Sequence, residues 1–289
     1  MTDQQNEFAG WIGTTRQEQD CVTRAPLTSM AALLDKDPSA AGLPGCLPPL
    51  WHWLYFHAPA RQSRLAPDGH PAKGEFLPPI TLPRRMWAGG RLTFLQDIPV
   101  GCEVTRTSTI DNISQKQGRS GRLAFVLVRH AINVDGKPAV LEHHDIVYRD
   151  APVSNAEPTA VNEAPLAPQD WDFSRQHCAD IVLLFRYSAL TFNAHRIHYD
   201  RDYAVGKEGY PGLVVHGPLL ATLLMELLTD NKAPIRLQEF SFRALRPVFD
   251  NQPFRACGKL LEDGQCQLWI ANQDNHLCME AMAHFHTGG

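Results

Sequence analysis

Residues 191–200, TFNAHRIHYD, place two histidines, an asparagine, an arginine, a tyrosine and an aspartate between two apolar runs. Histidine titrates near neutral pH, so it is well suited to proton transfer. The same side chains could instead hold a metal ion or form an ordinary solvated loop. A zinc site needs further ligands in defined geometry, and no motif here supplies them. We therefore expect no metal, and keep an acid–base pair and a surface loop as the two interpretations.

The elements that must position this segment begin with an apolar helix at 218–228, PLLATLLMELL, which carries six leucines. A helix that is apolar on nearly every side must be enclosed. Its length of about 16 Å is too short to cross a bilayer. Because strand-like segments follow it directly, the pattern predicts a helix wrapped by a curved antiparallel sheet, which is the hot-dog arrangement.

The start of this helix is suited to binding an anion. Pro218 fits the first helical position, and Gly217 before it lets a ligand approach the backbone closely. The free N–H groups and the positive end of the helix dipole point out of this terminus. A developing oxyanion could be stabilised there, an effect of about 3–4 kcal/mol per donor.

The rest of the chain divides into two similar halves. Residues 86–148 predict strands with an Asp-Gly hairpin turn in VDGK, and strands return after residue 235. We expect helix in 7–35, a short aromatic strand before a proline-rich loop at 58–83, and a strand in DIVLLFRYSALT. The predicted organisation is a unit at 1–150, an Ala/Pro-rich linker at 151–170 and a unit at 171–289. The first unit has no second copy of the polar segment, so we expect it to be non-catalytic and to support the substrate, and the second unit to be the catalytic one. The fold class is α+β, a double hot-dog with two curved antiparallel sheets that each wrap a central helix.

Composition limits the partners. The chain has 289 residues, a formal net charge of −4 and 44% hydrophobic residues, which is typical of a globular protein and gives no basic face for nucleic acid or membrane. The start MTDQQNEFAG lacks the features of a secretory signal, so we expect a cytoplasmic protein. The seven cysteines form no Cys-x-x-Cys pair and are expected to be reduced thiols.

The combination FNAHRIHYD…GLVVHGPLLA resembles the MaoC-like enoyl-CoA hydratases and dehydratases, which have the hot-dog fold. The variant FNxHRIHYD is similar to a subgroup with two hot-dog units in one chain. That subgroup includes hydroxyacyl-thioester dehydratases, mesaconyl-C4-CoA hydratases and itaconyl-CoA hydratases. The resemblance implies a hydro-lyase that acts on an acyl-CoA without a further cofactor, with a homodimer as the assembly.

The resemblance assigns catalytic roles to three residues. His198 matches the family's catalytic histidine and would activate water, while Gly217 matches the glycine whose N–H holds the thioester oxygen. Asn193 stands where the family has its catalytic aspartate; it would position the water, or it is a turn residue. His195 and Arg196 also depart from the family pattern. Either His198 performs both proton transfers, or the missing acid comes from Asp200, or from Glu142, His144 or Asp145 in the first half.

Arg196, Tyr199 and His216 are the expected substrate-binding residues. Arg196 could bind a substrate carboxylate, a CoA phosphate or a surface partner, with Arg84, Arg85 and Arg91 as rival anchors. Tyr199 would line the pocket or simply pack, and His216 would support the turn before the helix. The predicted reaction is hydration of itaconyl-CoA or mesaconyl-C4-CoA to citramalyl-CoA. The alternatives are a general 3-hydroxyacyl-thioester dehydratase, a hot-dog thioesterase and a non-catalytic acyl-CoA-binding protein.

Overall fold

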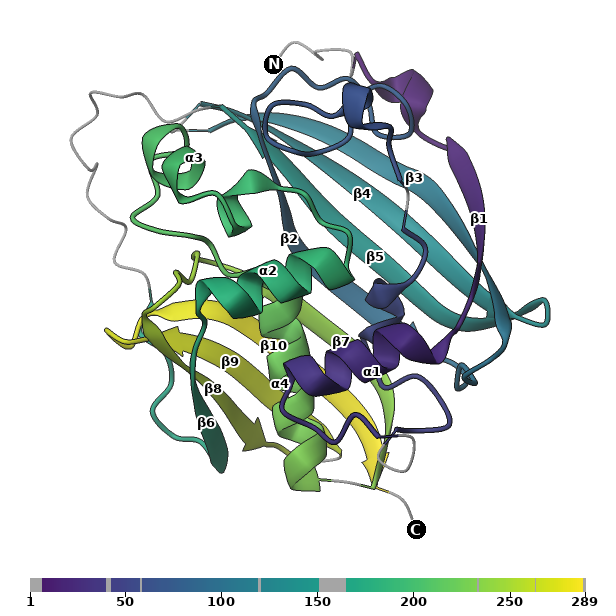
Figure 1. The fold of residues 1–289 in the computed structure, drawn as a ribbon, viewed down its shortest axis with the longest axis vertical. Coiled ribbons are helices and arrows are strands. Elements are labelled where there is room, and N and C mark those ends of the chain that lie inside the picture. The colour runs from purple at the N-terminus through teal and green to yellow at the C-terminus, as the bar shows by residue number, and fades with distance from the viewer. Residues whose placement is uncertain are drawn as a thin grey trace.

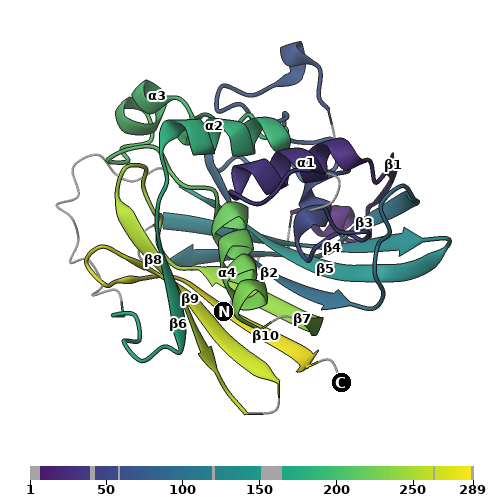
Figure 2. The ribbon, with the colours of Figure 1, turned by 60° about the horizontal axis from the view of Figure 1, so that its bottom comes forward.

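The computed structural model describes residues 7–39, 43–57, 59–118, 121–150, 165–232, 234–262 and 264–287. Most of the predicted linker, 151–164, lies outside the described residues. The described parts form a ten-stranded antiparallel sheet in the order β1-β3-β4-β5-β2-β7-β10-β9-β8-β6. Figures 1 and 2 show helices α1, α2 and α4 on the same face of this sheet.

The sheet consists of five strands from each half of the chain. The first five are β1 (Thr15–Cys21), β2 (Arg84–Phe94), β3 (Glu103–Gly118), β4 (Gly121–Val134) and β5 (Lys137–Arg149). The second five are β6 (Phe173–Cys178), β7 (Ile235–Ala244), β8 (Pro253–Leu260), β9 (Gln265–Asn272) and β10 (Leu277–Thr287). The predicted hairpin turn joins β4 to β5, with Asp135 and Gly136 at positive φ as an Asp-Gly turn requires.

The two half-sheets are joined edge to edge. Strand β2 pairs with β7, with Gly90 opposite Phe242 and Leu92 opposite Phe240. This arrangement agrees with the predicted double hot-dog class, with one correction. The two predicted sheets form one continuous sheet, because edge strand β2 of the first half pairs with edge strand β7 of the second. One hydrophobic core runs through both halves, from α1 to β10.

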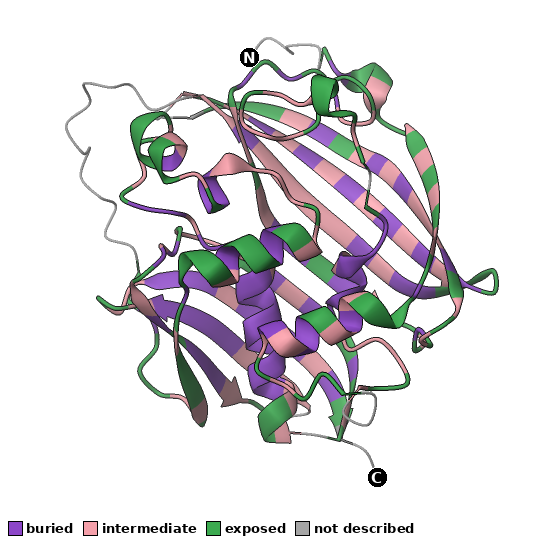
Figure 3. Ribbon diagram, in the orientation of Figure 1, coloured by how far each residue is buried: buried purple, intermediate pink, exposed green. Residues whose placement is uncertain are grey.

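Helix α4 (Gly217–Lys232) is the central helix of the second half, as its leucine pattern predicts. Every residue from Leu219 to Leu228 is buried, and Figure 3 shows most of the helix in the buried colour, with its C-terminal end exposed. The first half has the shorter α1 (Arg24–Leu33), which packs against α2 and η2 (Trp51–Leu54). The remaining helices are η1 (Ala9–Trp11), η3 (Gln62–Arg64), η4 (Arg196–His198) and α3 (Arg201–Gly206). Among the described helices, none has the length and apolarity to cross a bilayer.

Three local predictions are wrong. The segment DIVLLFRYSALT forms helix α2 (Ile181–Leu190), because the Asp180 side chain caps it by accepting from the N–H of Leu183 at 2.8 Å. An apolar run of this length fits a strand or a helix, and the cap decides between them. Residues 15–21 are strand β1 on the edge of the sheet, and the expected aromatic strand is the 3₁₀ helix η2.

Candidate active site

The polar segment begins where α2 ends, at a sharp reversal of the chain. Phe192 adopts φ +51°, a left-handed conformation that is uncommon outside glycine. The next N–H, of Asn193, donates to the carbonyl of Ser188 at 2.8 Å. The Asn193 Oδ1 accepts from the N–H of His195 at 3.0 Å, which fixes the turn and leaves the amide NH₂ as the remaining donor. Asn193 is thus a turn residue that also faces the cavity described below.

His198 is held in one orientation by a backbone carbonyl. Its Nδ1 lies 2.7 Å from the oxygen of Val214, so Nδ1 carries the proton and donates it to this bond. The other ring nitrogen, Nε2, is therefore left as a proton acceptor. The ring is only 7% exposed. Burial lowers the pKa of His198 to about 4, so the imidazole is neutral at neutral pH.

The ring of His216 packs against the ring of His198. The two rings stack with centroids 3.7 Å apart, and the His216 Nε2 shares a 2.8 Å hydrogen bond with the hydroxyl of Ser188. His216 is 1% exposed and does not line the cavity, so its expected contact with substrate is not present; it acts on the ring above it. Its carbonyl accepts from the N–H of Leu220, which places it at the first turn of α4.

Helix α4 begins at Gly217, directly after His216. Among the described residues no acceptor receives the N–H of Gly217, as expected for the first turn of a helix. The free N–H and the helix dipole make this terminus a site for developing negative charge. A Cβ built on Gly217 would meet only the carbonyl oxygen of Trp87, at 3.9 Å, so the space before this residue is open.

His198, Asn193 and Gly217 line one cavity of about 640 Å³ between the two halves of the chain. The volume is in the range of small-molecule sites. The first half contributes an aromatic wall that includes Trp53 and Trp87, whose rings meet edge to face at 5.0 Å. The charged residues in the lining are predominantly cationic: Arg16, Arg85, Arg106, Arg149 and Arg246, with Glu75 as the carboxylate. Arg16 and Arg106 already pair with Glu18, and the arginine that remains in excess suits an anionic ligand.

Arg196 and Tyr199, the other two expected substrate-binding residues, also lie outside this cavity. The guanidinium of Arg196 is bound by the Asp200 carboxylate, at 2.7 and 2.9 Å, and stacks over the ring of Tyr203. Tyr199 is 37% exposed and donates its hydroxyl proton to the carbonyl of Ala194. The sequence placed both near the site because they are neighbours of His198, but the 3₁₀ turn of η4 directs them away from it.

None of the carboxylates expected to supply an acid lines the cavity. Asp200 caps α3, with its Oδ1 accepting from Tyr203 N–H at 3.0 Å. Asp145 pairs with Arg91 at 2.7 Å. Glu142 is 2% exposed and accepts from His52, Trp53 and His144 at 3.0, 2.8 and 2.7 Å. His144 does line the cavity, where it stacks on Trp87.

His70 is not among the residues predicted from the sequence, yet it lines the cavity beside His195. It lies in the proline-rich loop, where the only signal is the tripeptide Asp-Gly-His at 68–70. Such a tripeptide is typical of turns, and nothing local shows that the fold brings it against the histidine motif.

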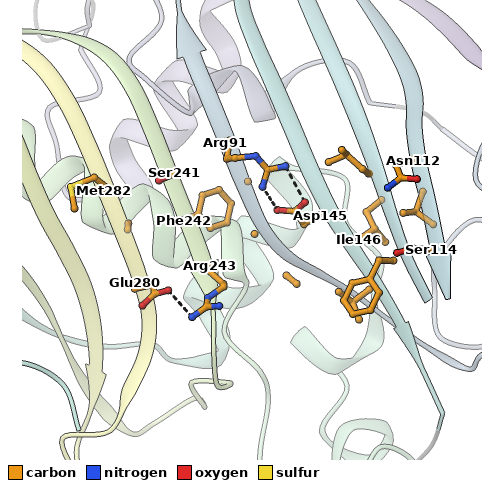
Figure 4. A pocket seen from close by; sticks show the side chains of 18 of the residues that line it. Arg91, Asn112, Ser114, Asp145, Ile146, Ser241, Phe242, Arg243, Glu280 and Met282 are labelled. Atoms are coloured by element: carbon orange, nitrogen blue, oxygen red, sulfur yellow. Dashed lines mark hydrogen bonds and ion pairs between the residues drawn. The ribbon is translucent and has the colours of Figure 1, made fainter. Parts of the chain in front are cut away.

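A second hollow of about 710 Å³ lies on the other face of the sheet, away from α4 (Figure 4). Its charged groups are already paired: Arg91 with Asp145, and Arg243 with Glu280 at 2.8 Å. No histidine or cysteine lines it. The side chains that could carry out proton transfer are therefore concentrated in the inner cavity.

Comparison with known proteins identifies related sequences. Residues 50–250 match the family model described as hydroxyacyl-thioester dehydratase type 2. A mesaconyl-C(4)-CoA hydratase of Chloroflexus aurantiacus is 48% identical over 250 residues, which cover 86% of this chain and 88% of that one. The mitochondrial hydroxyacyl-thioester dehydratase type 2 of Schizosaccharomyces pombe is 28% identical, with 78% and 80% of the two chains covered.

Solved structures share the fold at low sequence identity. A MaoC-like dehydratase superposes with a TM-score of 0.68 at 13% identity, covering 94% of this chain and 98% of that one. HtdX of Mycobacterium tuberculosis gives 0.63 at 15% identity, with 94% and 99% covered. Another M. tuberculosis protein, described as having a double hotdog fold, gives 0.57 at 13%, with 95% and 96% covered. These likenesses confirm the double hot-dog class.

Proposed function

Since the chain belongs to the hydroxyacyl-thioester dehydratase type 2 family, we propose that it adds water reversibly to a C5-dicarboxylyl-CoA, giving citramalyl-CoA. Membership of this family makes the protein a hydro-lyase of unsaturated acyl thioesters. Either mesaconyl-C4-CoA or itaconyl-CoA would be the unsaturated partner. The 48% identity to a mesaconyl-C(4)-CoA hydratase supports the first of them.

The observation that carries the proposal is the position of His198 and Gly217 on one cavity. The thioester oxygen binds at the Gly217 N–H, where the helix terminus stabilises the enolate that forms as water attacks. The Nε2 of His198 accepts a proton from this water, while the Asn193 amide donates a hydrogen bond to its oxygen. Water, a polarised carbonyl and a proton acceptor suffice for this addition, so we propose no cofactor beyond the CoA of the substrate.

Arg85 supports a dicarboxylyl substrate. In mesaconyl-C4-CoA the β-carbon that water attacks also carries the free carboxylate, so a carboxylate anchor must lie near the proton-transfer groups. Arg85 lines the cavity, and among the described residues no carboxylate pairs with it. Arg85 shares this cavity with His70 and His195, and burial, the main cause, together with the charge of Arg85 lowers the pKa of both. We therefore propose Arg85 in the place first expected for Arg196.

The two rival anchors are already occupied. Arg84 pairs with Glu208 at 2.8 Å and stacks over Tyr210. Arg91 pairs with Asp145 on the outer face of the sheet. An arginine that already neutralises a carboxylate is a weaker receptor for a second one.

Two other activities are compatible with parts of the site. The similarity to hydroxyacyl-thioester dehydratases favours a general 3-hydroxyacyl thioester as the alternative substrate. A thioesterase would direct water at the thioester carbonyl itself and release a free thiol. A thioester oxygen bound at Gly217 would suit the dehydratase and the thioesterase alike, so the two activities must be distinguished by their products.

The test is a panel of mesaconyl-C4-CoA, itaconyl-CoA, crotonyl-CoA and citramalyl-CoA, each scored by mass spectrometry for gain or loss of one water. We expect turnover of the dicarboxylyl thioesters in both directions without release of thiol. Turnover of crotonyl-CoA alone would establish the general dehydratase instead. Release of free CoA without hydration would establish the thioesterase.

The expected homodimer is also a proposal. One chain has a mass of 32.3 kDa, so light scattering of the purified protein should give about 65 kDa for a dimer. A mass near that of one chain would contradict it.

A further inference from the structure

The turn at residues 67–71 presents a carboxylate-backed histidine. The Asp68 Oδ2 lies 3.0 Å from the His70 Nδ1, and its Oδ1 accepts from the His70 N–H at 2.9 Å. Backbone bonds from Gly69 to Ala66 and from Ala66 to His70 close the turn, at 2.9 and 2.8 Å. Since the Asp68 carboxylate accepts at Nδ1, the Nε2 of His70 is left as the acceptor, as it is in His198.

This turn is docked on the histidine motif of the other half. The N–H of Arg196 donates to the Asp68 carbonyl at 2.9 Å, and its guanidinium donates to the Pro67 carbonyl at 3.1 Å. Gly69 has φ +91°, and a Cβ there would lie 1.8 Å from the carbonyl oxygen of Ala194. Only glycine can therefore occupy this position without displacing the turn.

The docking places the His70 ring in a row of imidazoles. Its centroid is 4.1 Å from that of His195, and His195 is 5.4 Å from His198. His70, His195 and His198 all line the cavity. The structure thus joins a carboxylate-backed histidine to the proposed base through a single intervening ring.

Hydration needs a place to hold the proton of water while the enolate exists. Position 193, where the resemblance expects an aspartate, holds an asparagine that cannot take up a proton. His198 has a carbonyl, not a carboxylate, at its Nδ1. Burial also lowers the pKa of His198 to about 4, which makes its imidazolium short-lived at neutral pH. Burial lowers the pKa of His70 as well, but there the Asp68 carboxylate opposes the shift.

We propose that His70, positioned by Asp68, is the second proton-transfer residue of the site and delivers the proton to the α-carbon. The inference rests on the proposed function. In hydration, a water O–H bond breaks as its oxygen bonds to the β-carbon, and the proton goes to Nε2 of His198. The π electrons move onto the thioester oxygen at Gly217.

The proton then moves to Nε2 of His70, whose imidazolium is stabilised by the Asp68 carboxylate. The enolate collapses and its α-carbon takes this proton, which returns His70 to the neutral form. Dehydration runs through the same steps in reverse. One proton is moved in each turnover, so the enzyme begins and ends neutral at both rings.

Two competing assignments are set apart by the test. His144 also lines the cavity and is hydrogen-bonded to a carboxylate, that of Glu142. This carboxylate also binds His52 and Trp53, and the His144 ring packs on Trp87. Alternatively, Asp68, His70 and His195 could bind a metal, since their ligand atoms lie within 4.8 Å of one another.

The experiment compares full-length wild type with His70→Gln, Asp68→Asn and His144→Gln. Arg64→Gln is the control, because its side chain is 66% exposed in the same loop and lies outside the cavity. We expect His70→Gln to lower kcat about a hundredfold or more with little change in KM, and Asp68→Asn to lower it less. Exchange of the substrate α-proton with D₂O should be lost in His70→Gln in step with kcat.

The pH profile separates catalysis from a structural role. Removing the Asp68 carboxylate lowers the pKa of His70, so the acid limb of kcat/KM should move to lower pH in Asp68→Asn; a merely loosened loop would not move it. Lys73, Arg85 and His195 also face His70 and are unchanged in this variant.

Several results would overturn the inference while leaving the proposed function intact. One is a wild type that hydrates its substrate while His70→Gln keeps full kcat and α-proton exchange. Another is loss of that exchange in His144→Gln alone. Stoichiometric zinc or iron in the purified wild type, absent from Asp68→Asn, would replace the proton role by a metal site. A wild type inactive on the whole panel would instead contradict the proposed function itself.

Discussion

The Nδ1 of His198 lies 2.7 Å from the carbonyl oxygen of Val214, and this bond fixes which nitrogen of the ring faces the cavity. Val214 precedes by three residues the glycine that opens α4, so the same short segment orients the base and supplies the oxyanion donor. The geometry of the site therefore depends on how η4 packs against the residues that precede α4.

Replacing His198 with Gln should lower kcat about a hundredfold or more, because the amide cannot accept the water proton. The substrate Kd should change little, since the thioester still binds at Gly217. The measurement is steady-state hydration together with binding of a non-reactive acyl-CoA. His286→Gln, a change at an exposed histidine at the end of β10, is the control and should leave both values unchanged.

Replacing Arg85 with Gln should lower kcat/KM for the dicarboxylyl thioester about tenfold to a hundredfold, since a charged hydrogen bond to the substrate carboxylate is lost. Any activity toward crotonyl-CoA, which has no such carboxylate, should fall much less. Arg91→Gln on the outer face is the matched control. Equal losses for both substrates would show that Arg85 does not recognise the carboxylate.

Replacing Gly69 with Ala should displace the docked turn, because its Cβ would collide with the Ala194 carbonyl and because φ is +91°. We expect a loss of about 1–3 kcal/mol in the free energy of unfolding and a clear fall in kcat. Gly74→Ala is the control: φ there is +96°, in the same loop, but its Cβ would make only an ordinary contact of 3.7 Å. Equal kcat in the two variants would count against the docking argument.

The free energy of unfolding should decrease as the pH falls from about 7 toward 4. The pKa of His198 is lowered to about 4, below its ordinary value of 6.5, so in this window the unfolded chain binds the proton first. The contribution is at most about 3 kcal/mol, complete above the unfolded pKa and lost as the pH falls toward the folded one.

The groups that face His198 are the Val214 carbonyl and the rings of His70, His195 and His216. His216 is buried and the other two rings are half-buried, and desolvation lowers the pKa of all three. Asp68 titrates below this window, because the bond from His70 keeps its pKa low despite burial. Urea unfolding at pH 5, 6 and 7.5 measures the effect. His198→Gln should show a shallower pH dependence, and an unchanged slope would mean that His198 does not stay neutral in the fold.

Replacing Glu142 with Gln should destabilise the first half by about 3 kcal/mol, since the buried carboxylate binds His52, Trp53 and His144 together. Glu103→Gln, exposed and at the start of β3 in the same half-sheet, is the control. Thermal unfolding of both variants decides whether the buried network is needed.

The sequence by itself determined the central helix, the strands within 86–148 and after 235, and the pairing of a histidine motif with a glycine at a helix start. These follow from local patterns: the leucine repeat of α4, the Asp-Gly turn, and residues within a few positions of one another. It failed for α2, because a short apolar run fits a strand or a helix until the Asp180 cap is considered. It also placed Arg196 and Tyr199 at the site because they are neighbours of His198, although a 3₁₀ turn points adjacent side chains in different directions.

Only the tertiary structure decided which distant residues share the cavity. His70 and Arg85 are more than a hundred residues from His198 in sequence, and they reach it because β2 pairs with β7 and the 67–71 turn docks on Ala194 and Arg196. The physical reason is that contacts between remote segments depend on strand pairing and side-chain packing across the whole sheet. The Asp-Gly-His tripeptide contains no local pattern that would predict these contacts.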